Sequence, residues 1–136
     1  MVKEITLDAV ITNIPAVTAF VDEALEAAEC PLKIQMQIDV AMDEIFTNIS
    51  SYAYPNSTGS ATVKVDFETE SRVFTIITED GGIPYNPMEK EDPDVTLSAE
   101  ERGIGGLGIF LVKKLMDRMD YRYENGKNIL TMQKKI

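Results

Sequence analysis

Histidine is absent from this 136-residue sequence, and its absence excludes several kinds of chemistry within the chain. No histidine can carry a phosphoryl group, bind zinc or activate a serine or cysteine nucleophile. Any general base must therefore be a carboxylate, a lysine or a tyrosine. Cysteine is nearly absent too: Cys30 is the single one, so no disulfide can form within the chain.

Basic residues are scarce, with 13 lysines and arginines against 23 acidic residues and a net charge of −10. Nucleic-acid binding depends on clustered basic residues, so we expect no nucleic-acid partner. No apolar run approaches the roughly 20 residues of a membrane span, which predicts no membrane association. Without a signal-peptide pattern the chain is expected to be cytoplasmic. The apolar content of 44% predicts a single domain over residues 1–136.

Half of the eight glycines lie within six residues, from Gly103 to Gly108, directly before an apolar segment with helical spacing. Ordering glycine costs backbone entropy, so this cluster indicates a sharp bend or a close approach of the backbone to another group. A helix N-terminus offers unpaired N–H groups and a partial positive charge, which favour an anion such as phosphate. A glycine-rich turn before an ordinary core helix is the alternative.

Helices and strands are both expected from the apolar pattern, which indicates an α+β fold. Helical spacing predicts three helices, over residues 15–29, 32–53 and 107–119. Alternating or continuous apolar residues predict strands over residues 3–9, 61–68 and 72–79, and a final hairpin around Asn125-Gly126. Residues 88–102 are acidic and poorly periodic, so we expect a long loop that stays mobile or closes as a lid.

Two polar positions lie at the edges of these elements. Glu44 and Asn48 are four residues apart beside the apolar stripe of the second predicted helix, so they share one face at the boundary between core and solvent. A solvated polar edge is the alternative for this pair. Asp80 ends a buried strand before two glycines, where a flat ligand could approach the backbone, although Asp-Gly-Gly is also ordinary turn chemistry.

Three segments, in this order, resemble the motifs of GHKL (Bergerat-fold) ATPases, and among them the small bacterial anti-sigma regulatory serine/threonine kinases. Residues 43–48 resemble the N box, residues 80–84 the first glycine box and residues 102–108 the second. The resemblance covers nearly the whole chain. It implies a two-layer α/β sandwich in which about three helices cover one face of a mostly antiparallel mixed sheet.

The resemblance also implies roles for individual residues. Glu44 would be the catalytic base and Asn48 the ligand of magnesium, a cation that prefers oxygen ligands. Asp80, followed by Gly82, would accept a hydrogen bond from the adenine amino group of ATP. Asn128 lies near the position where relatives often carry an adenine-side threonine. The second glycine box would bind the ATP phosphates through Arg102, Gly103, Gly105, Gly106, Leu107 and Gly108.

The function implied by the resemblance is that of an ATP-dependent serine/threonine kinase. Such a kinase phosphorylates a small anti-sigma-factor antagonist and controls a sigma factor by partner switching, and relatives of this type often form homodimers. A non-catalytic, ATP-dependent binding module that sequesters a regulatory partner is one alternative. An ATPase-like or histidine-kinase-like domain is another, although the missing histidine removes an internal phosphoacceptor.

Overall fold

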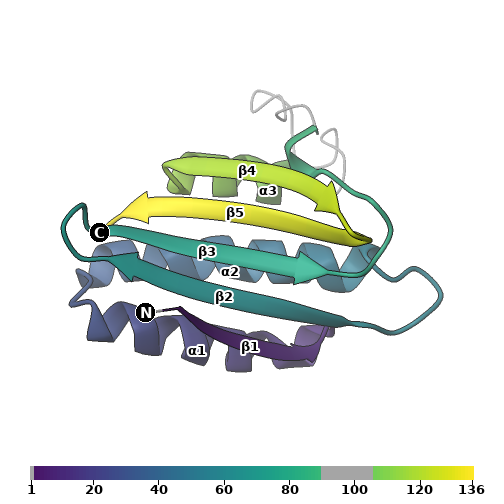
Figure 1. Cartoon of the computed structure of the whole chain (residues 1–136), viewed down its shortest axis with the longest axis horizontal. Helices are drawn as coiled ribbons and strands as arrows, with labels where there is room; N and C mark the ends of the chain where they lie inside the picture. The colour runs from purple at the N-terminus through teal and green to yellow at the C-terminus, as the bar shows by residue number, and fades with distance from the viewer. Residues whose placement is uncertain (1, 90–105) are drawn as a thin grey trace.

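A computed structural model describes residues 2–89 and 106–136 as two layers, with helices packed on one face of a sheet (Figure 1). The strands are β1 (Lys3–Asp8), β2 (Ser60–Glu68), β3 (Val73–Asp80), β4 (Arg118–Glu124) and β5 (Lys127–Lys135). The α-helices are α1 (Ile14–Ala27), α2 (Leu32–Tyr52) and α3 (Gly106–Leu115), and short 3-10 turns are η1 (Ile11–Asn13) and η2 (Pro87–Glu89). The predicted α+β sandwich is confirmed.

The five strands follow the order β1-β2-β3-β5-β4, and every pair in the described ranges is antiparallel. The expectation of a mostly antiparallel sheet is therefore confirmed, and no parallel pair occurs among the described strands. The predicted hairpin between β4 and β5 is confirmed. Its turn residues, Asn125 and Gly126, have φ angles of 53° and 76°, the left-handed conformation that tight hairpin turns require and that asparagine and glycine adopt readily.

Helix α2 lies at the centre of the core. Its side chains at helical spacing are buried against the sheet: Ile38, Ala41, Met42, Ile45, Phe46 and Ile49. Removing an aliphatic or aromatic side chain of this size from water stabilises the fold by about 1.5–3 kcal/mol, so this helix is firmly held. Glu44 and Asn48, on the polar flank of α2, are thereby held in place as well. None of the helices within the described ranges has the length and apolar character to cross a membrane.

Helix α3 ends earlier than predicted: residues 107–119 were expected, whereas the helix covers Gly106–Leu115. The chain leaves the helix because the sheet binds the following backbone. The N–H of Asp117 donates to the carbonyl of Gln133 at 2.9 Å, and the Asp117 carboxylate accepts the Lys135 N–H at 2.8 Å. Strand pairing thus overrides helix propensity after Leu115.

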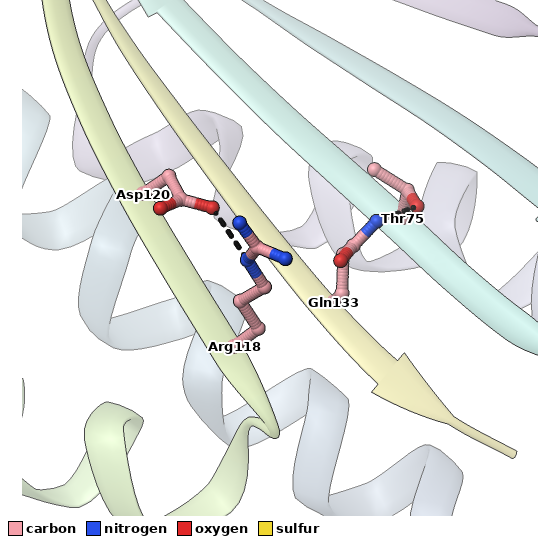
Figure 2. Close-up of polar contacts among 4 residues, drawn as sticks. All are labelled: Thr75, Arg118, Asp120 and Gln133. Atoms are coloured by element: carbon pink, nitrogen blue, oxygen red, sulfur yellow. Dashed lines mark hydrogen bonds and ion pairs between the residues drawn. The ribbon is translucent and has the colours of Figure 1, made fainter.

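The face of the sheet opposite the helices is polar where Figure 2 shows it. The side-chain amide of Gln133 on β5 donates to the Thr75 hydroxyl on β3 at 3.2 Å, and Arg118 pairs with Asp120 along β4 at 2.9 Å. Surface pairs of this kind contribute little to stability. The buried residues that could form a site lie instead between the two layers.

Candidate nucleotide-binding site

A pocket opens between the C-terminal half of α2 and the end of β3, two segments that approach one another in Figure 1. Its empty volume is about 410 Å³, part of it open to solvent. Apolar side chains make up much of its wall: Ile45, Ile49, Ala53, Ile83, Pro87 and Leu130. Such a wall suits a flat, largely apolar ring system.

Asp80 forms the polar end of this pocket. It is the last residue of β3 and only 7% exposed. Its Oδ1 atom accepts the Gly82 N–H at 3.0 Å and the side-chain amide of Asn128 at 2.9 Å. No donor from the described part of the chain is recorded for Oδ2. A carboxylate oxygen has lone pairs for such bonds, so Oδ2, on a residue that lines the pocket, is suited to accept an N–H from a ligand.

Asn128 lies directly opposite Asp80 in the register of β3 and β5, and it is also 7% exposed. Its Nδ2 atom donates to Asp80 and, at 2.8 Å, to the carbonyl of Ile83. Its Oδ1 atom accepts the backbone N–H of Tyr85 at 3.0 Å and the hydroxyl of Tyr121. Asn128 therefore joins β3, β4, β5 and the first glycine box.

Tyrosines form the aromatic part of the pocket wall. Tyr52 on α2 stacks on Tyr85, with ring centroids 5.9 Å apart and an interplanar angle of 28°. Both line the pocket together with Tyr121. Burial, as the main cause, raises the pKa of Tyr121, so its hydroxyl keeps the proton that it donates to Asn128. The wall thus combines ring surfaces with an oriented hydrogen-bond network.

Asn48 lines the same pocket, whereas Glu44 lies one helical turn earlier on α2 and is not part of the pocket wall. Glu44 is instead next to Gly108 of α3. A Cβ atom at Gly108 would lie 2.3 Å from Oε2 of Glu44, so the Glu44 carboxylate would have to move to admit a side chain there. The structure therefore brings residues of the N box and of the second glycine box together, as their proposed roles require.

Gly82 has a packing role in this structure. A Cβ atom at Gly82 would lie 2.2 Å from the backbone oxygen of Ala53, just beyond the end of α2. The same oxygen accepts the N–H of Ile83 at 2.9 Å. Gly82 is outside the wall of the pocket, but its N–H holds Asp80. The first glycine box is thus fixed to α2, and this contact sets the position of Asp80.

The rest of the second glycine box is only partly within the described ranges. Gly106 and Leu107 begin α3, so this helix starts inside the glycine run as expected. Arg102, Gly103 and Gly105 lie outside the described residues, as does most of the predicted lid over residues 88–102. Their roles stay predictions.

The donor set around the pocket fits magnesium in one particular way. No cluster of three or more acidic, cysteine or histidine side chains that could hold a metal by itself occurs in the ranges 2–89 and 106–136. Magnesium is commonly held by one or two protein oxygens together with the phosphates of a nucleotide. The side-chain oxygen of Asn48, at the wall of the pocket, matches that arrangement.

Four polar or aromatic pocket residues were missed in the sequence: Tyr52, Thr78, Tyr85 and Tyr121. Thr78 lies two residues before Asp80 on β3, and alternate residues of a strand share one face, so the spacing could have identified it. Tyr121 reaches the pocket only because β4 pairs with β5, and nothing in the local pattern indicates that pairing with this site.

Comparison with known proteins places these features in a family. The model of the histidine kinase-like ATPase domain matches residues 7–134. The serine/threonine-protein kinase BtrW of Bordetella bronchiseptica is 24% identical over 100 residues, which cover 74% of this chain and 70% of BtrW. The serine-protein kinase RsbW of Bacillus thuringiensis is 27% identical over 95 residues, which cover 67% of this chain and 58% of RsbW.

A solved structure shows the same fold. The histidine kinase domain of the blue-light activated histidine kinase EL346 from Erythrobacter litoralis superposes with a TM-score of 0.57 and 16% identity, over 78% of this chain and 46% of that one. The family model covers nearly all the residues that build the two layers and the pocket. This chain therefore belongs to the histidine kinase-like ATPase domain family, the GHKL type that its motifs resemble.

Proposed function

We propose that this chain is an ATP-dependent protein serine/threonine kinase of the anti-sigma type, acting on a small anti-sigma-factor antagonist. One observation carries the proposal: Asp80 and Asn48 line a single pocket, and Glu44 lies on the same helix face next to the second glycine box. These are the positions at which such a kinase needs a base-recognition group, a metal ligand and a proton acceptor. The kinase names of the relatives support the proposal.

Adenine is the base that the polar end of the pocket favours. Oδ2 of Asp80 accepts a hydrogen bond, and the amino group of adenine donates one. Guanine presents a carbonyl oxygen at the corresponding position, which would face the carboxylate as a second acceptor. A site built around a buried acceptor discriminates strongly against ligands that lack the donor. The apolar wall and the stacked tyrosines would enclose the faces of the ring.

The triphosphate would extend from the adenine end toward Asn48 and the start of α3. Backbone N–H groups at the start of a helix suit phosphate oxygens, and α3 starts within the glycine run. Asn48 is the residue that would ligate magnesium through its amide oxygen. When bound, magnesium supplies positive charge that stabilises the phosphates during transfer.

Phosphoryl transfer would use Glu44 as the general base. The hydroxyl oxygen of a serine on the antagonist attacks the γ-phosphorus, and the bond from that phosphorus to the oxygen bridging the β- and γ-phosphates breaks. The carboxylate of Glu44 accepts the hydroxyl proton, and ADP leaves with the bridging oxygen. Phosphorylation would release the antagonist and free the kinase to bind a sigma factor instead.

The direct experiment incubates the full chain with labelled ATP, magnesium and a cognate antagonist, followed by mass spectrometry of the antagonist. We expect one phosphoserine that depends on ATP and on magnesium. ATP binding without phosphoserine would contradict the kinase assignment, and failure to bind ATP would contradict the assignment of the pocket.

A second candidate is a binding module that uses ATP to sequester its partner without phosphorylating it. The observation that favours it is the position of Glu44 outside the pocket wall. Stoichiometric, ATP-dependent binding of the antagonist without phosphoserine would support this alternative. Movement of Glu44 upon nucleotide binding, seen in a crystal structure with an ATP analogue, would instead support the kinase.

A further inference from the structure

We infer that Asn128 is a positioning residue for nucleotide selection: its side chain orients the Asp80 carboxylate toward the base and makes no contact with the nucleotide itself. The inference rests on the proposed function insofar as the ligand is an adenine nucleotide. It differs from the expectation that Asn128 replaces an adenine-side threonine as a contact to the base. Every hydrogen-bonding atom of the Asn128 side chain is already bonded within the protein.

The side-chain amide of Asn128 has no capacity left for a ligand. A carboxamide offers two N–H donors and one oxygen with two lone pairs. Both donors are engaged, with Asp80 and the carbonyl of Ile83, and the oxygen accepts from Tyr85 and Tyr121. A direct contact with the base would require one of these buried hydrogen bonds to break, and an unpaired buried polar group is unfavourable.

The same network determines which way round the amide lies. The backbone N–H of Tyr85 and the hydroxyl of Tyr121 both point at one atom of the Asn128 side chain. An N–H group at that position would face the Tyr85 N–H, which can only donate, and the oxygen would face the Ile83 carbonyl, which can only accept, so the amide lies with its oxygen toward Tyr85. The nitrogen is therefore directed at Asp80, and the carboxylate accepts a hydrogen bond from it.

Two donors on one oxygen fix the carboxylate. The terminal torsion of an aspartate side chain has a broad preference, so neighbouring groups decide its orientation. Asn128 and the Gly82 N–H both bind Oδ1 of Asp80, at 2.9 and 3.0 Å. This arrangement turns Oδ2 away from the protein donors, on a residue that lines the pocket. Without Asn128, the Gly82 N–H would be the one donor among the described residues that still holds the carboxylate plane.

The test compares two nucleotides, with and without the amino group, in wild-type protein and in one variant. ATP and purine riboside triphosphate, which lacks the amino group, are titrated by calorimetry into wild-type protein and Asn128→Leu. For wild-type protein we expect ATP to bind roughly 10- to 100-fold more tightly, as one hydrogen bond to a carboxylate allows. In Asn128→Leu the preference should fall to about 3-fold or less. Equal weakening of both nucleotides, with the preference retained, would overturn the inference.

Gln133→Leu is the matched control. Gln133 also lies on β5 and also bonds across to β3, through Thr75, but on the opposite face of the sheet (Figure 2). It should lose a comparable cross-strand hydrogen bond and keep the wild-type preference for ATP. Loss of the preference in this control as well would mean that any disturbance of the strand pair has the same effect, which would overturn a specific role for Asn128.

Asn128→Asp keeps the inference testable if the leucine variant fails to fold. A second carboxylate would then face Asp80, so ATP affinity should fall at neutral pH. It should recover on acidification, because a protonated carboxyl regains a donor. The wild-type profile, measured alongside, should lack this recovery. An Asn128→Asp profile parallel to the wild-type profile would count against the inference.

A measurement without nucleotide separates failure of the inference from failure of the proposed function. If wild-type protein binds both nucleotides equally or binds neither, recognition of adenine by Asp80 is wrong. The positioning of Asp80 can still be followed by hydrogen exchange of the Gly82 amide, which the carboxylate protects. That exchange should be faster in Asn128→Leu than in Gln133→Leu. Equal rates would show that Asn128 does not hold Asp80.

Discussion

Gly108 on α3 and Glu44 on α2 are packed so closely that a Cβ atom at Gly108 would lie 2.3 Å from Oε2 of Glu44. The position of this carboxylate therefore depends on the lack of a side chain at residue 108. The atom that would be displaced is the end of a flexible side chain and not backbone. A substitution at Gly108 should consequently disturb catalysis more than it disturbs the fold.

The first prediction concerns Gly108→Ala. The added methyl group should move the Glu44 carboxylate and lower phosphoryl transfer to the antagonist by about 10-fold or more, since catalysis depends on closely set geometry. The preference for ATP over purine riboside triphosphate should stay within about 3-fold of the wild-type value, since the adenine contact is elsewhere. Gly81→Ala is the control, because a Cβ there has Tyr54 Oη at 3.7 Å as its nearest neighbour. Equal loss in both variants would show that proximity to Glu44 is irrelevant.

A second prediction concerns the base preference of Asp80→Asn. The new amide can keep its oxygen toward the Gly82 N–H and Asn128, so the fold should survive. Its nitrogen would then face the pocket as a donor. ATP affinity should fall by roughly 10- to 100-fold. Inosine triphosphate carries a carbonyl in place of the amino group, so its affinity should rise relative to that of ATP. Calorimetric titration with both nucleotides measures this ratio, and an unchanged ratio would rule out Asp80 as the selector.

The third prediction concerns stability. In Gly82→Ala, the methyl group would meet the backbone oxygen of Ala53, which cannot move without displacing the end of α2. We expect a loss of about 1–3 kcal/mol in the free energy of unfolding, the usual cost of forcing atoms into a packed region. Urea denaturation measures it, again with Gly81→Ala as the control. A Gly82→Ala variant as stable as the control would place this contact in doubt.

A fourth prediction concerns pH. Burial raises the pKa of Asp39 on α2 to about 8, and a hydrogen bond with Asp22 and the charges of Asp22, Asp43 and Glu26 add to the effect. The unfolded chain ionises near the ordinary value of 3.8. Between these values the folded state holds a proton that the unfolded state has lost. This group therefore lowers stability as the pH rises from about 4 to about 8, with no further change above that range.

Asp39→Asn should remove this contribution. Between pH 4 and pH 8, the free energy of unfolding of Asp39→Asn should rise relative to that of wild-type protein. Because the carboxyl is partly solvated, we expect this difference to be only about 1–2 kcal/mol. Asp8→Asn removes a negative charge from an exposed position at the end of β1 and serves as the control. Denaturation midpoints across this pH range should diverge for the two variants. Parallel curves would show that Asp39 is not held protonated.

The elements of the fold were predictable because their apolar periodicity is local. The alternation in β2 and the helical spacing in α2 are confirmed, and so is the turn at Asn125 and Gly126. The end of α3 was predicted too late because the competing interaction is remote in sequence. The backbone N–H of Asp117 pairs with Gln133 on β5, so the chain leaves the helix before this residue. The residues around Asp117 carry no sequence pattern that predicts this pairing.

The residues of the candidate site were likewise predictable only in part. Motif spacing identified Asp80 and Asn48, and the structure places both in one pocket wall. The network of Asn128 was not predictable, because its partners Ile83, Tyr85 and Tyr121 come from separate segments that only the assembled sheet brings together. Chain order can suggest which residues share a site, whereas the use of each hydrogen-bonding atom requires coordinates.

The most direct test of the central claim compares Glu44→Gln with wild-type protein in single-turnover phosphoryl transfer to a cognate antagonist. We predict that the variant binds ATP with nearly wild-type affinity but transfers phosphate about 10²- to 10⁴-fold more slowly, because glutamine cannot accept the serine proton. Transfer at the wild-type rate by Glu44→Gln would contradict the account.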